Sequence, residues 1–450
     1  MALGAVGEAV SEPTPPPPTP QPGPVATPPP GLLPLIFGVT ITGILANTLV
    51  VPALPDILRA FDQPDASAGL FVAAGTLPGV VMAPVIGVLA DRHGRRAILV
   101  PCLVGFGLFG ALNAFAPTWE LMLVLRLLQG AGAAGLINLA VVIISDHWTG
   151  LDRTRRVAQN SAVLTVSLAV FPPIGGGLTE LGGWRLSFAP YSLALVTAAL
   201  IWRRLDPARP PAPPRMRDQL AAARDAIRHR DVIGSITIGA VVFLLMFGLF
   251  LTALPVHLEN EFGLSAGARG LILAAPAVTS TLAALRLGHW RGRHGAVAVL
   301  RAAAALFVVS FLFVGVAPSL PLLVAGSALY GVGEGIFIPT LQDVVASAAP
   351  PDQRGAVIAV WTGAARFGQT IGPLVVGAAY GALGTGRTFV VGAAAAGGLV
   401  VAESVGRFGD ERTAAAHPTP APAAPAGQGP VPSTAPAALR RHHPGDGRDL

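Results

Sequence analysis

Residues 87–99 read GVLADRHGRRAIL, a short charged stretch with a long apolar run on either side. Its acid, its three arginines and its histidine all fall between residues 91 and 96. Charge is scarce elsewhere, because only 12% of the 450 residues are charged, against about 25% in soluble domains. The mean hydropathy is +0.62. A chain of this composition has little contact with water, so the stretch predicts a turn at a membrane surface between two spanning helices.

Long apolar runs recur along the chain. About 20 apolar residues are needed to cross ~30 Å of hydrocarbon as a helix, and we count twelve such runs. A transmembrane β-barrel would show short alternating segments instead. The sequence thus predicts an all-α membrane protein with twelve transmembrane helices. Their expected positions are 32–54, 68–89, 98–116, 119–144, 157–178, 186–203, 232–255, 266–287, 296–316, 320–346, 355–380 and 386–406.

The basic residues, all of them arginine, predict the orientation of these helices. With a cytoplasmic N-terminus, the inside loops and the C-terminal tail hold 24 arginines, and the outside loops hold four, Arg59, Arg185, Arg269 and Arg387. This asymmetry is the positive-inside pattern, and it places both termini in the cytoplasm and the chain in the cell (inner) membrane. Because the arginines are spread over many short loops, we expect no nucleic-acid partner.

Several classes of chemistry have no support in the sequence. The single cysteine, Cys102, excludes an intramolecular disulfide and suits no cysteine-based metal site. No nucleotide-binding loop, zinc motif or nucleophile elbow stands in a usable context. We expect no metal, no cofactor and no enzyme activity, so that energy for any transport must come from a gradient.

The spans fall into two groups, separated by a break and flanked by tails. We expect a six-helix half at 32–203, a cytoplasmic linker with an amphipathic helix at 204–231, and a second six-helix half at 232–410. The Pro-rich residues 1–31 and the Ala/Pro/Gly-rich residues 411–450 predict disordered tails. A partner-binding role for the tails stays open.

An internal repeat supports the two halves. A shift of 201 residues carries Gly87 onto Gly288 and Gly94 onto Gly295. A shift of 200 carries the tripeptide ALP at 53–55 onto ALP at 253–255. We interpret this as a parallel duplication about an axis normal to the membrane.

The charged stretch lies between the second and third expected helices. Gly87 and Gly94 permit close helix approach and a tight turn, and the arginines lie where anionic lipids of the inner leaflet attract them. Asp91 does not fit the positive-inside pattern. An acid at a helix end can contact the N-terminus of another helix or an arginine, so Asp91 is a candidate for half of a breakable gate.

At this point the chain resembles the major facilitator superfamily. GVLADRHGRR is similar to the superfamily's G-x-L-a-D-r-x-G-r-r signature, and RLLQGAGAAG at 126–135 is similar to its fourth-helix R-x-x-Q-G-x-G pattern. The resemblance implies that Asp91 contacts the start of the eleventh helix near Gly355 and that Arg95 pairs with Asp146. Both contacts would close the cytoplasmic side. A simple turn-capping role for Asp91 remains the alternative.

A third resemblance concerns the fifth helix. SLAVFPPIGGGL at 167–178 resembles the antiporter signature G-x-x-x-G-P-x-x-G-G of twelve-helix drug/proton antiporters, with Pro172, Gly175 and Gly176 in place. Ser167 and Phe171 stand where the signature has glycine. The resemblance implies antiport, and the two departures leave the direction of transport open.

Charged side chains inside spans are functional candidates, because burying them in hydrocarbon is costly. Glu334 and Arg366 lie at similar depth, ~18–20 Å from the inner ends of consecutive helices at 1.5 Å per residue, and they should pair or share a cavity. Glu334 is the best candidate for a proton carrier, and a purely structural pair is the alternative. By resemblance, Arg126 faces a central cavity and aids proton transfer, unless it only packs helices. Asn47 stands where many antiporters have an acid.

We therefore expect a secondary transporter that works by alternating access, a proton-coupled exporter of amphipathic drugs or metabolites. An importer or exchanger of a polar solute, and a non-transporting membrane sensor on the same fold, are the alternatives. The expected partners are a small-molecule substrate, protons and membrane lipids, and the expected state is a monomer.

Overall fold

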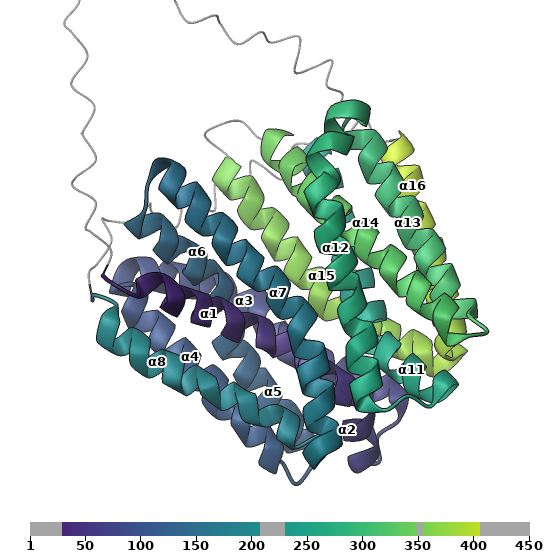
Figure 1. The fold of residues 1–450 in the computed structure, drawn as a ribbon, viewed down its shortest axis with the longest axis horizontal. Coiled ribbons are helices and arrows are strands. Elements are labelled where there is room, and N and C mark those ends of the chain that lie inside the picture. The colour runs from purple at the N-terminus through teal and green to yellow at the C-terminus, as the bar shows by residue number, and fades with distance from the viewer. Residues whose placement is uncertain (1–28, 208–229, 349–353, 406–450) are drawn as a thin grey trace, which may run out of the picture. The chain divides into compact units, whose positions relative to one another are not determined.

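The computed structural model of the chain describes residues 29–207, 230–348 and 354–405, and helices dominate these ranges (Figure 1). Eleven helical segments within the described ranges are long and apolar enough to span a membrane. A further helix, α15 (Arg354–Leu383), is long enough but less apolar than these. The prediction of an all-α protein with twelve spanning helices in two halves is confirmed.

The helices of the first half correspond to the first six apolar runs. They are α1 (Leu32–Thr48), α2 (Leu54–Ala60), α3 (Ala68–His93), α4 (Arg95–Leu112), α5 (Trp119–Ala133), α6 (Leu136–His147), α7 (Gly150–Gly182) and α8 (Leu193–Arg204). Short 3₁₀ turns join or extend them at η1 (Val51–Ala53), η2 (Asp65–Ser67), η3 (Asn113–Phe115) and η4 (Leu186–Ser192).

The helices of the second half correspond to the other six runs. They are α10 (Arg230–Leu245), the π-helical η5 (Met246–Ala253), α11 (Leu254–Phe262), α12 (Ala266–His294), α13 (Ala296–Val316), α14 (Leu320–Ala348), α15 and α16 (Thr385–Val405). The two expected tails and the linker fall almost entirely outside the described residues.

The observed helices extend past the apolar runs that predicted them. The fifth run was expected at 157–178, whereas α7 covers Gly150–Gly182. Hydropathy marks only the part of a helix that lies in hydrocarbon, and the helix continues into the wet interface where polar side chains are hydrated. The fourth run is interrupted near Gly135, where a Cβ atom would collide with the side chain of Ile86 on α3.

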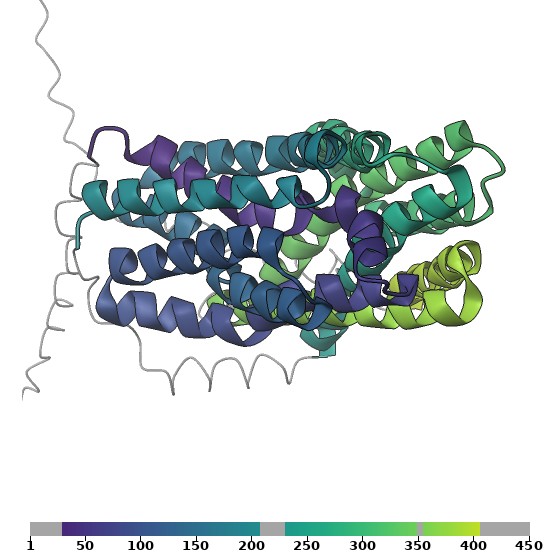
Figure 2. The same cartoon turned by 90° about the horizontal axis from the view of Figure 1, so that it is seen from below.

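The two halves meet along two helix pairs, α7 with α12 and α3 with α15. In Figures 1 and 2 the purple-to-teal helices lie mainly on one side of this junction and the green-to-yellow helices on the other. Helices α7 and α12 lie side by side near α2 and α11 and diverge toward their other ends (Figure 1). We call the end with α2 and α11 the closed end, and the end with the α3–α4 turn the opposite end.

Candidate functional site

A cavity of about 620 Å³ lies between the two halves. Its walls come from α1, α3, α5, α6 and α7 on one side and from α10, η5, α12, α14 and α15 on the other. Ligand pockets of drug-sized molecules have volumes of about 300–1,000 Å³. The cavity is therefore large enough for a small organic molecule.

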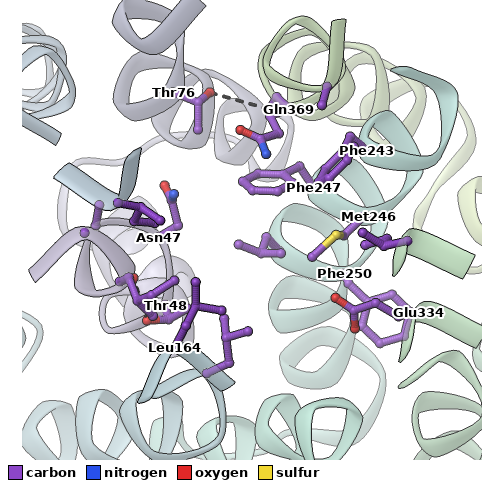
Figure 3. Close-up of a pocket in the computed structure, with 18 of the residues that line it drawn as sticks. Asn47, Thr48, Thr76, Leu164, Phe243, Met246, Phe247, Phe250, Glu334 and Gln369 are labelled. Atoms are coloured by element: carbon purple, nitrogen blue, oxygen red, sulfur yellow. Dashed lines mark hydrogen bonds between the residues drawn. The ribbon is translucent and has the colours of Figure 1, made fainter. Parts of the chain in front are cut away.

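The two walls of the cavity differ in chemistry (Figure 3). The first half contributes small apolar residues and neutral polar side chains, among them Asn47 and Thr48. The second half contributes an aromatic wall, in which the rings of Phe250 and Tyr330 are stacked with their centroids 3.6 Å apart. The other aromatic and sulfur-containing residues of this wall are Phe243, Met246, Phe247 and Trp361.

The π-helical turn η5 supplies much of the aromatic wall. Met246, Phe247 and Phe250 all belong to it. The hydroxyl of Thr252 donates to the Phe247 carbonyl oxygen, five residues earlier, at 2.8 Å. A π-turn widens the helix by one residue and is frequent at functional sites. Nothing in the sequence pattern indicated it.

The cavity holds one acid and one base among its described lining residues, Glu334 and Arg366. Neither side chain forms a hydrogen bond or an ion pair in the described part of the chain, and Arg366 Nε is buried without a partner. Figure 3 shows the Glu334 carboxylate beside Phe250, directed into the cavity. The sequence predicts that Glu334 and Arg366 either pair or share a cavity. In the structure they share a cavity and do not pair. The reason is that Arg366 reaches across to α3, where its Nη1 would lie 3.0 Å from a Cβ atom at Gly79.

Of the other two predicted cavity residues, Asn47 lines the cavity and Arg126 does not. Arg126 is only 3% exposed. It donates to Gln129 Oε1 at 3.1 Å and lies over the ring of Phe71, 4.4 Å from its centroid. Its guanidinium would lie 3.1 Å from a Cβ atom at Gly75, which is itself a lining residue. Arg126 thus lies directly behind the cavity wall.

The charged turn of residues 87–99 lies at the opposite end. Arg95 Nε donates to Asp146 Oδ2 at 3.0 Å, the pair that the resemblance implies, and Arg95 also pairs with Asp91. Gly94 has φ of 94°, in the region that favours glycine. A Cβ atom at Gly87 would meet nothing within 4 Å. The expected contact of Asp91 near Gly355 involves side chains outside the described part.

The second half carries its own ion pair at the opposite end, which the sequence did not reveal. Arg291 Nη2 and Asp343 Oδ2 are 2.6 Å apart and join α12 to α14. Gly295 repeats the positive φ of Gly94, at 78°. Gly292 replaces the acid in this copy, so the ion pairs of the two halves at the opposite end are built from different residues.

A second feature missed from the sequence seals the closed end. Arg269 of α12 pairs with Asp56 of α2 and with Glu259 of α11, and Arg59 of α2 contacts the same two carboxylates. These four residues, the closed-end cluster, connect the two halves. The sequence assigned Arg59 and Arg269 only to outside loops. The signal was present, because Arg59 and Glu259 occupy equivalent positions of the 200-residue repeat with opposite charges.

The fifth-helix signature residues lie at close helix contacts near the closed end. A Cβ atom at Gly176 would collide with the carbonyl of Ala266, and one at Gly270 would collide with the carbonyl of Pro172. Gly175 lies in the same way against the carbonyl of Leu49, within the first half. Glycine therefore permits α7 to contact both α1 and α12 backbone to backbone.

The comparisons with known proteins agree with this architecture. The bacillibactin exporter of Bacillus subtilis (strain 168) is 26% identical over 348 residues, covering 74% of this chain and 86% of that protein. The class C tetracycline resistance protein of Escherichia coli is 29% identical, covering 80% and 93%.

Among solved structures, a bacterial homologue of the human lysosomal transporter Spinster, in an inward-facing and occupied conformation, matches with a TM-score of 0.70. It is 17% identical and covers 87% of this chain and 98% of that chain, which shows a shared fold. The model of the Major Facilitator Superfamily matches residues 36–247 and again residues 236–443, so it spans both halves. The chain belongs to the major facilitator superfamily of membrane transporters.

Proposed function

We propose that this transporter exports amphipathic drugs or metabolites from the cytoplasm in exchange for protons, by alternating access through the cavity between its halves. The observation that carries the proposal is the cavity itself, which is mostly apolar and has one acid, Glu334, among its described lining residues. An apolar wall with few polar groups accepts varied greasy ligands, and a lone acid inside a membrane protein is a candidate proton carrier. The names of the two relatives, an exporter and a resistance protein, support export.

The orientation of the chain in this proposal follows from its arginines. The positive-inside pattern places the opposite end, with the charged turn, in the cytoplasm, together with both termini. The closed end then faces the outside of the cell membrane. In this proposal the closed-end cluster and the contacts of α7 with α12 separate the cavity from the outside, and the carrier is in an inward-facing state. We expect it to work as a monomer surrounded by lipid.

The transport cycle uses the two ends in turn. Substrate enters the cavity from the cytoplasm, and the halves then rock until the closed-end cluster opens. The turn around Asp91 and Arg95 closes the cytoplasmic side in that second state. A proton from outside binds Glu334 when the substrate leaves, and the proton is released to the cytoplasm after the carrier returns. Asn47 lines the first-half wall of the cavity, across from Glu334. Arg126 lies behind the same wall and aids proton transfer.

A second candidate is the import or exchange of a polar solute. The neutral polar side chains of the first-half wall, Asn47 and Thr48 among them, favour it. Direction distinguishes the two candidates, because an exporter should protect a pump-deficient bacterium against members of a compound panel and an importer should not.

The decisive experiment is substrate-driven proton movement in proteoliposomes. Wild-type protein should move protons in the direction opposite to the substrate, whereas Glu334→Gln should lose this flux and keep substrate exchange, measured at saturating substrate, in the absence of a gradient. Glu120→Gln, an exposed acid in the first turn of α5, is the matched control and should behave like wild type. An unchanged proton flux in Glu334→Gln would remove Glu334 from the coupling, and flux in the same direction as the substrate would make the carrier a symporter.

A further inference from the structure

We infer that the cavity selects zwitterions that carry an aromatic or other apolar body, with the ligand's cationic group on Glu334 and its anionic group on Arg366. The inference rests on the proposed function, because it concerns the ligand of the same cavity. It adds the charge pattern of the ligand, which the proposed function leaves open.

The first observation is that both charges lack a protein partner. Glu334 and Arg366 form no hydrogen bond or ion pair in the described part of the chain. Opposite charges at similar depth on consecutive helices would be expected to form one. An uncompensated charge in a low-dielectric site is costly, and a charged or hydrogen-bonded partner reduces that cost. A ligand with both charges supplies a partner to each residue at once.

The second observation is that the two charges are separated. Their charged atoms lie more than 4.0 Å apart, since no ion pair forms between them. The guanidinium of Arg366 lies beside Gly79 of α3, in space that the side chain of any other residue at position 79 would occupy. Both residues line the same cavity, Glu334 from α14 and Arg366 from α15, so one ligand in the cavity has access to both charges.

The third observation concerns the rest of the cavity. Apart from Glu334 and Arg366, every described lining residue is neutral, so discrimination by charge depends on these two. The stacked Phe250 and Tyr330 lie on the same half, and aromatic faces bind apolar and aromatic bodies. A ligand with a single charge would bury its body equally well but would leave either Glu334 or Arg366 without a partner.

Three fluorescent probes with the same dansyl group test this selectivity. They are Nε-dansyl-lysine, a zwitterion; dansylcadaverine, a cation; and N-dansyl-6-aminohexanoic acid, an anion. Binding to the purified full chain in nanodiscs is measured by fluorescence at neutral pH, with empty nanodiscs subtracted. We expect the zwitterion to bind at least tenfold more tightly than either singly charged probe.

The variants assign each charge to its residue. Glu334→Gln should weaken the binding of the zwitterion and of the cation but not that of the anion. Arg366→Gln should weaken the binding of the zwitterion and of the anion but not that of the cation. Arg366→Lys keeps the positive charge and should restore most of the anion binding, which separates loss of charge from loss of fold. Glu120→Gln, an exposed acid that does not line the cavity, is the control and should leave the binding of all three probes unchanged.

Two results would overturn the inference: equal binding of dansylcadaverine and Nε-dansyl-lysine, or unchanged zwitterion binding in Arg366→Gln. The binding assay uses no gradient, so its outcome is independent of proton coupling. Absent proton flux with intact probe selectivity would contradict only the proposed function. Intact flux with no selectivity would contradict only the zwitterion preference.

Discussion

Arg269 and Arg59 contact the same two carboxylates, Asp56 and Glu259, but in different surroundings. The side chain of Arg269 is 1% exposed, and that of Arg59 is 64% exposed. Exposed ion pairs contribute about 0–1 kcal/mol, whereas removing one partner of a buried pair costs roughly 3–5 kcal/mol, because the other charge is left without compensation. The two arginines should therefore differ in their effect on the closed end.

We predict that Arg269→Ala opens the closed end and that Arg59→Ala has a much smaller effect. The measurement is the rate at which a membrane-impermeant thiol reagent, added outside, labels a cysteine introduced at Thr165 in a Cys102→Ala background. Labelling should be at least several-fold faster in Arg269→Ala. Arg387→Ala, an exposed arginine outside the closed-end cluster, should label like the parent, and equal labelling in all variants would show that the cluster does not hold the closed end.

Asp91 carries a second prediction at the scale of a residue. In this structure Arg95 is held by both Asp91 and Asp146 within one half, so Asp91→Asn leaves the Asp146 contact and should barely change the melting temperature. It should reduce transport several-fold, because the neutral amide interacts more weakly with a helix N-terminus in the other state. Asp152→Asn, an exposed acid at the start of α7, is the control. Full transport by Asp91→Asn would leave only a turn-capping role.

At the scale of elements, the contact of α7 with α12 depends on the absence of side chains. Gly176 and Gly270 each lie against a backbone carbonyl of the facing helix. The contact lies near the closed end, where the halves must separate when the carrier faces outward. A methyl group there would therefore oppose one state of the carrier more than the fold of either half.

We predict that Gly270→Ala shifts the carrier toward the outward-facing state. Its Cβ atom would collide with the Pro172 carbonyl, so the closed end would no longer pack fully. Outside labelling of a cysteine at Thr165 should rise several-fold, with little change in melting temperature. Gly177→Ala adds the same methyl group where nothing lies within 4 Å and should label like the parent. If both variants label alike, the contact does not control the conformation.

The sequence predicted the helices well, because a long apolar run is the main signal of a spanning segment. It did not predict the π-turn η5, since Met246, Phe247 and Phe250 are apolar in either helical form. It placed Glu334 and Arg366 at equal depth but did not decide whether they pair. That outcome depends on the direction of the Arg366 side chain, which lies against Gly79 of α3, a helix far from Arg366 in the sequence.

For the whole molecule, the repeat predicted two halves. It did not predict at which end of the molecule the two halves pack against each other. A transporter sequence must fit at least two arrangements of its halves, so motifs at both ends are present whichever state is formed. The Arg95–Asp146 pair followed from the resemblance. The closed-end cluster had no motif, because its members come from α2, α11 and α12, and two of its contacts, Arg269 with Asp56 and Arg59 with Glu259, form only when the halves pack together.

The contact of Arg59 with Glu259 has a consequence for how this chain came to close at that end. The two positions are copies of one another, so a carrier assembled from two identical halves would place the same residue at both. Two arginines or two glutamates would then face each other and repel. Opposite charges at these two positions require halves that differ in sequence, as the halves of this chain do. The seal is thus a property of the asymmetric single chain, and a symmetric ancestral pair of half-length subunits would have lacked this contact.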